Sequence, residues 1–238
     1  MTWNNLVPAD RRFATAMKTT GRPMPRPSHV VCHITGSDSF ASVKKTFLTS
    51  VSAHYVVDKA GVIYQFVQED DQAWHAGIAR STLALYAQGA QAWRKYLFYF
   101  EWTRYPIGSV FVDENLQPVE GGRVATFVRR ADGADWPHYA YFDQRWGAGT
   151  MPANYATSQY PNAYSVGIEI LSLGATKASD ETYTPAMYRS LRSLVTDICA
   201  RQAIPMQKGH VLGHEDVNPV QRYGWDPNQG FDWTQVWA

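Results

Sequence analysis

The run HVVCHIT at residues 29–35 constrains the fold more than any other stretch, because it is short, apolar and rich in β-branched side chains. Such a run predicts a buried strand, and His33 near its end would be aimed toward the mouth of a sheet, where sites usually form. SVGIEIL at 165–171 predicts a second strand. SAHYVVDKAGVIYQFVQ contains two strand-like runs around a turn at 59–61, which indicates a hairpin.

Two segments carry helix signals. DSFASVKKTFLTS offers Asp38 as an N-cap, and TPAMYRSLRSLVTDICARQAIP offers Thr184 as an N-cap with Pro185 at the first helical position. Apolar residues of the second segment fall on one helical face. Together these elements predict the α/β class (mixed α+β), with a mostly mixed central β-sheet flanked by helices.

We expect a single domain over residues 1–238, with a lead-in at 1–28 and a long insertion at about 81–160. The insertion is turn-rich and aromatic, and no linker-like composition brackets it. Aromatic residues make up 14% of the chain, and either stacking on sugar rings or ordinary core packing would account for that excess. The first part of the insertion, STLALYAQGAQAWRKYLFYF, has roughly helical spacing of apolar residues.

Composition narrows the range of partners. The 22 basic and 21 acidic residues nearly cancel, which argues against nucleic acid as a partner. No stretch approaches the roughly 20 apolar residues of a membrane span, so we expect no membrane insertion, and no export signal is recognisable. Two cysteines, Cys32 and Cys199, are expected to be buried free thiols. We also expect a monomer.

A metal site is the chemistry that the histidines favour. His33 and His214 each lie near the end of a short apolar run, and Asp226 follows in a turn-rich loop. Two imidazoles and a carboxylate are good zinc ligands and leave the fourth position for water, as in hydrolytic zinc sites. Spacing alone leaves the alternative that Asp226 caps a turn before Pro227 while His214 bonds to a loop. HExxH is absent, so a helix-borne zinc protease site has no support.

Five ordered segments carry a family resemblance: VVCHITG, SAHYVVDKAGVIYQFV, AWHAG, NAYSVGIEI and GHEDVNPVQRYGWDP. They resemble the zinc-dependent N-acetylmuramoyl-L-alanine amidases (amidase_2), a superfamily of cell-wall recycling amidases, phage lysins and animal peptidoglycan-recognition proteins. The resemblance covers about 29–77 and 162–233. It implies one Zn²⁺ ion held by His33, His214 and Asp226.

The resemblance also implies that Glu169 is the general base, which takes a proton from the zinc-activated water and delivers one to the departing amine. The alternative is a salt-bridged strand residue. Many relatives carry a lysine two residues before the aspartate ligand, where this chain has Gly224. Arg222 is the nearest cation that could stabilise the oxyanion in its place, and the alternative is a surface arginine with no role. Trp74 and His75 match a loop that lines the substrate groove. Trp74 could stack on a sugar or pack under the loop, and His75 could hydrogen-bond the stem peptide or carbonyl, or bond only to the backbone of the loop.

The implied activity is hydrolysis of the amide bond between N-acetylmuramic acid and L-alanine of the peptidoglycan stem peptide. Two alternatives stay open: a peptidoglycan-binding protein that does not cut, and a zinc peptidase of another class. The setting is either cytoplasmic wall recycling on muropeptides, or a bacteriolytic endolysin made in the cytoplasm and acting on the cell wall. We expect the insertion to form one wall of the groove and to restrict which peptidoglycan fits.

Overall fold

The computed structural model describes residues 3–79, 82, 110–112, 127–129, 160–173, 183–207, 209–222, 226–227 and 230–237. Apart from residue 82, the predicted helix after residue 81 lies outside these residues, as does most of the predicted insertion. Two short strands within that span, β6 (Val110–Val112) and β7 (Phe127–Arg129), pair in antiparallel fashion.

A five-stranded sheet with the order β4-β3-β8-β2-β9 forms the centre of the fold. Its strands are β2 (His29–Ile34), β3 (Tyr55–Val57), β4 (Ile63–Gln65), β8 (Ser165–Ile170) and β9 (Val211–Gly213). Strand β2 pairs in parallel with β8 and β9, β3 pairs in parallel with β8, and β4 is the antiparallel edge strand. The predicted mixed sheet, its two buried strands and the hairpin are therefore confirmed.

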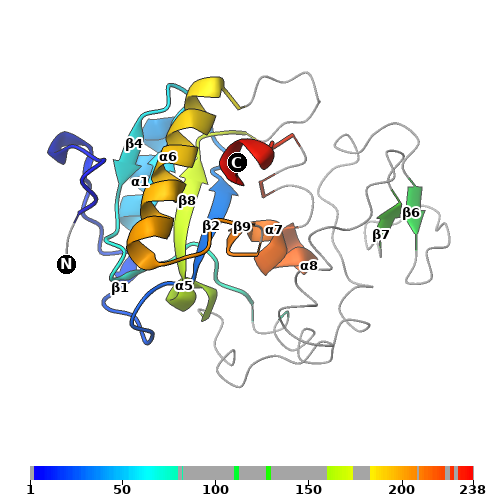
Figure 1. Cartoon of the computed structure of the whole chain (residues 1–238), viewed down its shortest axis with the longest axis horizontal. Helices are drawn as coiled ribbons and strands as arrows, with labels where there is room; N and C mark the ends of the chain where they lie inside the picture. Colours follow the sequence, from blue (N-terminus) through cyan, green and yellow to red (C-terminus); the bar gives the residue numbers. More distant parts are fainter. Residues whose placement is uncertain are drawn as a thin grey trace.

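Helix α6 (Pro185–Gln202) covers one face of this sheet, and α1 (Phe40–Thr49) packs on the other (Figure 1). The larger core lies under α6, where its apolar face meets alternate residues of β2, β3 and β8. The smaller core joins α1 to β3 and to the segment after β4. Because side chains alternate across a strand, the sheet residues that face away from α6 are the ones available to build a site.

The two predicted helix starts have different outcomes. The Thr184 hydroxyl accepts a hydrogen bond from the Met187 amide, and Pro185 opens α6, as predicted. The predicted cap Asp38 is wrong, because Ser39 accepts from the Ser42 amide and α1 begins at Phe40. Serine and aspartate are comparable caps, so their order along the chain cannot decide between them.

Short elements complete the described fold. They are the 3₁₀ turn η1 (Ala9–Arg11), strands β1 (Lys18–Thr19) and β5 (Gln72–Ala73), which pair with each other, and helices α5 (Tyr160–Tyr164), α7 (His214–Val217), α8 (Pro219–Arg222) and α9 (Thr234–Trp237). Both cysteines are buried free thiols, as predicted, and Cys32 faces the α6 side of the sheet.

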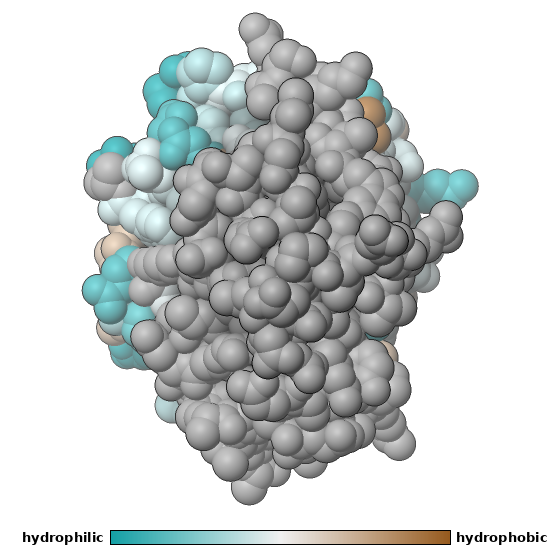
Figure 2. Space-filling model, turned by 90° about the vertical axis from the view of Figure 1, so that its right-hand side faces the viewer, coloured by the Kyte–Doolittle hydropathy of each residue, from teal (hydrophilic) through white to brown (hydrophobic). Residues whose placement is uncertain are grey.

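The described surface is mostly polar. Only four large hydrophobic residues of the described chain are well exposed: Leu6, Leu48, Val51 and Leu173. Hydrophilic residues also predominate among the coloured atoms of Figure 2. Within the described residues, no helix combines the length and the apolar character that a bilayer crossing requires.

Candidate metal centre

Strand ends bring two of the predicted ligands together. His33 lies at the carboxyl end of β2, and His214 follows the last residue of β9 as the first residue of α7. The two strands are parallel neighbours, with Cys32 opposite Gly213. Because parallel strands present their carboxyl ends at one edge of the sheet, both imidazoles reach the same edge.

The third predicted ligand, Asp226, completes a compact triangle of donor atoms. Nδ1 of His33 lies 3.0 Å from Nδ1 of His214, which in turn lies 2.9 Å from Oδ2 of Asp226. The remaining side, from His33 Nδ1 to Asp226 Oδ2, measures 3.7 Å. A tetrahedral zinc ion with ligands at about 2.0–2.1 Å separates its donors by about 3.3 Å. The triangle therefore has the size that a zinc ion requires, and all three residues are buried.

Backbone amides hold the Asp226 carboxylate in place. The Ile34 amide donates to Oδ1 at 2.9 Å, which leaves Oδ2 directed at the two histidines. The Glu215 amide donates to the Asp226 carbonyl oxygen at 2.8 Å. Burial raises the pKa of Asp226, but hydrogen bonds with His214 and His33 outweigh burial and hold it well below its ordinary value. The carboxylate is therefore ionised, the state in which it binds a metal.

His214 has the neutral ring that a metal ligand needs. Burial, with a smaller contribution from the neighbouring His33, lowers its pKa to about 4 against the opposing effect of Asp226. Its Nε2 atom is buried and has no hydrogen-bond partner among the described residues. The Asp216 carboxylate accepts from the Gly213 amide, and the Asn218 amide donates to the His214 carbonyl, so both residues brace the turn that carries this candidate ligand.

Glu169 lies beside this triangle. It is opposite His33 in the parallel pairing of β8 with β2, which places both side chains on the face of the sheet away from α6. Its Oε2 atom is buried and has no partner within the described part of the chain. Burial raises the pKa of Glu169 to about 7, with His33 and Arg222 opposing the shift and Asp226 adding to it. Within the described part of the chain, Glu169 forms no ion pair, which favours the predicted base over a salt-bridged strand residue.

The other predicted site residues have different surroundings. The charge of Arg222 influences both Glu169 and His214, so its guanidinium lies near the candidate site, whereas Gly224 lies outside the described residues. The Trp74 indole donates to the Thr19 hydroxyl at 3.1 Å. His75 bonds to His33 through Nδ1 and to Ser165 through Nε2. The roles predicted for these three residues at the substrate stay predictions.

Some neighbours of the site carry no signal in the sequence. The Ile34 amide is a backbone group, and every residue except proline has one. Gly167 is different, because a Cβ atom there would lie 2.5 Å from Cγ and Nδ1 of His75. A glycine inside an apolar strand indicates close approach by another part of the chain, and that signal could have been read from SVGIEIL.

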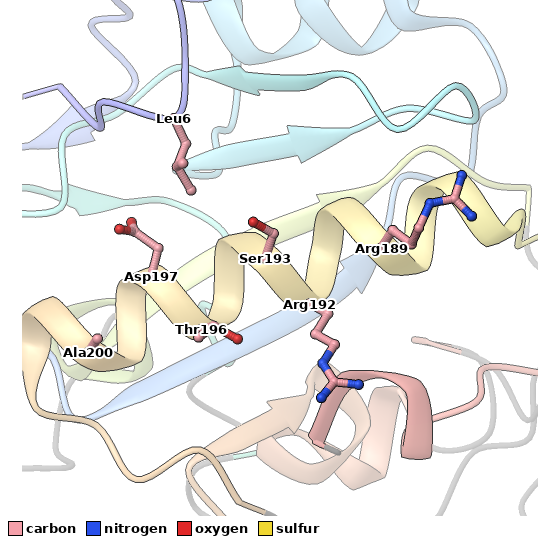
Figure 3. A pocket seen from close by; sticks show the side chains of 7 residues that line it. All are labelled: Leu6, Arg189, Arg192, Ser193, Thr196, Asp197 and Ala200. Carbon is pink, nitrogen blue, oxygen red and sulfur yellow. The ribbon is translucent and has the colours of Figure 1, made fainter.

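A pocket on the solvent side of α6 lies apart from this centre. It is lined by Leu6, Arg189, Arg192, Ser193, Thr196, Asp197 and Ala200 (Figure 3). None of these residues is among the candidate ligands, and α6 covers the face of the sheet opposite to His33. The pocket is therefore not the site described above.

A comparison with protein families matches most of the chain to one family. A family model described as N-acetylmuramoyl-L-alanine amidase matches residues 22–229, which is most of the chain. A curated relative, the 1,6-anhydro-N-acetylmuramyl-L-alanine amidase AmpD of Enterobacter cloacae, is 31% identical over 102 residues. That alignment covers 42% of this chain and 48% of the relative, so the chain spans about half the length of this relative.

Solved structures give weaker likenesses. A selenomethionine derivative of AmpD is 19% identical, with a TM-score of 0.47 and coverage of 99% of this chain and 97% of that one. The amidase AmiD from E. coli, in complex with the substrate anhydro-N-acetylmuramic acid-L-Ala-D-gamma-Glu-L-Lys, is 24% identical with a TM-score of 0.47. That match covers 89% of this chain and 56% of AmiD. The family match, rather than these scores, carries the assignment.

Proposed function

The chain belongs to the N-acetylmuramoyl-L-alanine amidase family, and we propose that it hydrolyses the amide bond between N-acetylmuramic acid and the L-alanine of the peptidoglycan stem peptide, with one bound Zn²⁺ ion. The observation that carries the proposal is the buried triangle of His33, His214 and Asp226, together with a buried Glu169 oxygen that has no partner among the described residues. A non-catalytic binding protein would need neither the complete donor set nor a desolvated carboxylate.

The donor set suits zinc in chemistry as well as size. Two imidazoles and one carboxylate are three protein ligands, the number found at hydrolytic zinc sites, and they leave a position for water or substrate. A zinc ion bound by His33, His214 and Asp226 would supply a Lewis acid that polarises a carbonyl oxygen and acidifies water. Sulfur ligands are absent from the candidate group, which disfavours a closed structural site.

Glu169 would move the proton in this reaction. A general base works best when its pKa lies near the working pH, and burial raises the pKa of Glu169 to about 7. The Oε2 atom has no partner within the described residues, so it is available to accept a proton from the attacking water and to return one to the departing amine. Arg222, whose charge influences Glu169, is the proposed source of positive charge for the developing oxyanion.

Digestion of two substrates, with and without a chelator, tests the proposal. Purified protein is incubated with intact sacculi and with small muropeptides, and the products are analysed by mass spectrometry. Stem peptides with free L-alanine amino termini, lost on chelation and restored by zinc, are the expected result. Protein that sediments with sacculi but leaves them uncut would identify a binding protein, and cleavage at a different bond would identify another zinc peptidase.

The same digestion addresses the biological setting. We propose that the enzyme acts either on the intact wall, as a phage lysin does, or on muropeptides during wall recycling. Preference for sacculi supports the first setting and preference for muropeptides supports the second. Deleting residues 81–160 should change this preference if the insertion forms one wall of the groove.

A further inference from the structure

Behind the candidate metal centre, a chain of hydrogen bonds leads away from His33. Its Nε2 atom lies 2.9 Å from Nδ1 of His75, and Nε2 of His75 lies 3.2 Å from the Ser165 hydroxyl oxygen. That hydroxyl lies 2.6 Å from the Pro161 carbonyl oxygen. We propose that His75 is a positioning residue that fixes the tautomer and the ring orientation of His33. The inference rests on the proposed zinc site.

The proton positions along this chain follow from its last member. The Pro161 carbonyl can only accept, so Ser165 must donate its single hydroxyl hydrogen there. The Ser165 oxygen then accepts from Nε2–H of His75, which leaves Nδ1 of a neutral His75 as an acceptor. His33 must therefore donate from Nε2, and its Nδ1 keeps a free lone pair.

That lone pair is the one that a metal requires. Nδ1 of His33 is the atom that belongs to the triangle with His214 and Asp226. The opposite tautomer would place a hydrogen on Nδ1 and prevent coordination. A protein partner on the second ring nitrogen of a ligand histidine fixes its tautomer and typically contributes 10–100-fold to metal affinity.

The position of the His75 ring is itself determined by its neighbours. The Asn162 side-chain oxygen accepts from the amides of His75 and Ala76, at 3.3 and 2.7 Å. The ring lies against Gly167 of β8, where a Cβ atom would be 2.5 Å from Cγ and Nδ1 of His75. It meets the His33 ring at 5.0 Å between centroids and nearly at a right angle. Both ring nitrogens are thus engaged by protein atoms, which suits a positioning role.

Zinc affinity of matched variants tests the inference. His75→Leu removes the acceptor, whereas His75→Asn keeps an oxygen near the position of Nδ1. Gly167→Ala keeps His75 in the sequence but adds a Cβ atom to the space that the His75 ring occupies. His210→Asn is the control, because it removes a histidine hydrogen-bonded to the Ser28 carbonyl at the opposite end of β9. Competition with a chromophoric chelator gives the dissociation constant of each protein for zinc, and unfolding of the metal-free form checks folding.

We expect His75→Leu and Gly167→Ala to weaken zinc binding by about 10–100-fold. His75→Asn should bind within a few-fold of wild type, and His210→Asn should be unchanged. Folded His75→Leu protein with wild-type zinc affinity would overturn the inference. If the variant kept wild-type zinc affinity while the wild-type protein bound zinc and cut substrate, the role of His75 would be refuted but the proposed function would still hold. A wild-type protein that binds no zinc would remove both.

Nuclear magnetic resonance of the wild-type protein supplies a readout that does not depend on the folding of any variant. Long-range ¹H–¹⁵N spectra of the zinc-loaded protein should show both His33 and His75 with the hydrogen on Nε2. The His33 Nε2–H proton should exchange slowly with solvent, because it is bonded to His75. A His33 ring with its hydrogen on Nδ1 would contradict the inference directly.

Discussion

Glu169 should make the metal-free protein less stable as the pH rises. Its Oε2 atom is buried without a partner among the described residues, and burial raises its pKa from 4.5 to about 7. The folded protein thus keeps this proton at pH values where the unfolded chain has released it. Because the folded-state pKa is the higher one, stability is lost as the pH rises from the unfolded pKa to the folded one.

The size of the effect follows from those two pKa values. Each unit of pKa difference corresponds to about 1.36 kcal/mol, so the loss between about pH 5 and pH 8 is about 2.5 kcal/mol. The Glu169 side chain is partly exposed as a whole, and solvent screening reduces the expected loss to roughly 1–2 kcal/mol.

Glu169→Gln isolates this contribution, because glutamine does not titrate. Denaturant unfolding of chelator-treated wild type and variant at the two pH values gives the difference directly, and packing effects of the glutamine cancel between them. Relative to wild type, the variant should gain roughly 1–2 kcal/mol from about pH 5 to pH 8. Asp38→Asn, which removes an exposed carboxyl group, is the control. Zinc loading should shrink the gain, because a nearby cation favours the ionised carboxylate.

The same variant should retain zinc and lose most of its turnover. If wild type and Glu169→Gln have the same pH dependence of stability, the carboxylate is not desolvated and the reasoning from its burial fails. Near-normal turnover would remove Glu169 from the base role whatever its stability effect. The pH dependence of unfolding and the turnover, measured together, distinguish a catalytic role of Glu169 from a purely structural one.

Three further predictions concern the metal ligands and their support. Asp226→Ala should weaken zinc binding by more than the 10–100-fold typical of an outer-shell partner, and unchanged zinc content by elemental analysis would contradict the ligand assignment. Gly213→Ala should also weaken zinc binding, because a Cβ atom there would lie 2.8 Å from Cδ of Pro227 and would displace the adjacent Asp226; a dissociation constant equal to wild type would show that the loop adapts. Chelation should abolish hydrolysis and lower the melting temperature, since a ligand at about 100 times its dissociation constant contributes about 2.7 kcal/mol; activity that survives dialysis against a chelator would exclude a catalytic metal.

Much of the fold could be predicted because its signals are local. Short β-branched runs identify β2 and β8, a turn with glycine identifies the hairpin of β3 and β4, and Thr184 with Pro185 identifies the start of α6. The Ser39 cap was missed because Asp38 satisfies the same rule one residue earlier. The local signals therefore fix the type of each element more firmly than its ends.

The grouping of the candidate ligands could be predicted because they are tied to strand ends. His33 and Glu169 are register partners near the carboxyl ends of β2 and β8, and His214 follows β9, which neighbours β2. A sequence that specifies parallel strands therefore also specifies which side chains meet at their shared edge. The family resemblance assigned the roles at that edge, and the structure brings the donor atoms to within 3.7 Å of one another.

The support for those ligands could not be predicted, because it depends on segments that return over the edge of the sheet. The Ile34 amide turns Oδ2 of Asp226 toward the histidines only because residue 226 is brought back against β2. His75 reaches His33 only because α5 supplies Pro161 and Asn162 and because β8 has a glycine beside the ring. Strand ends therefore determine which residues gather in the candidate metal centre, whereas the returning segments determine which atom of each residue faces the others. The glycine inside β8, the strand that carries Glu169, is the sequence signal that connects the two.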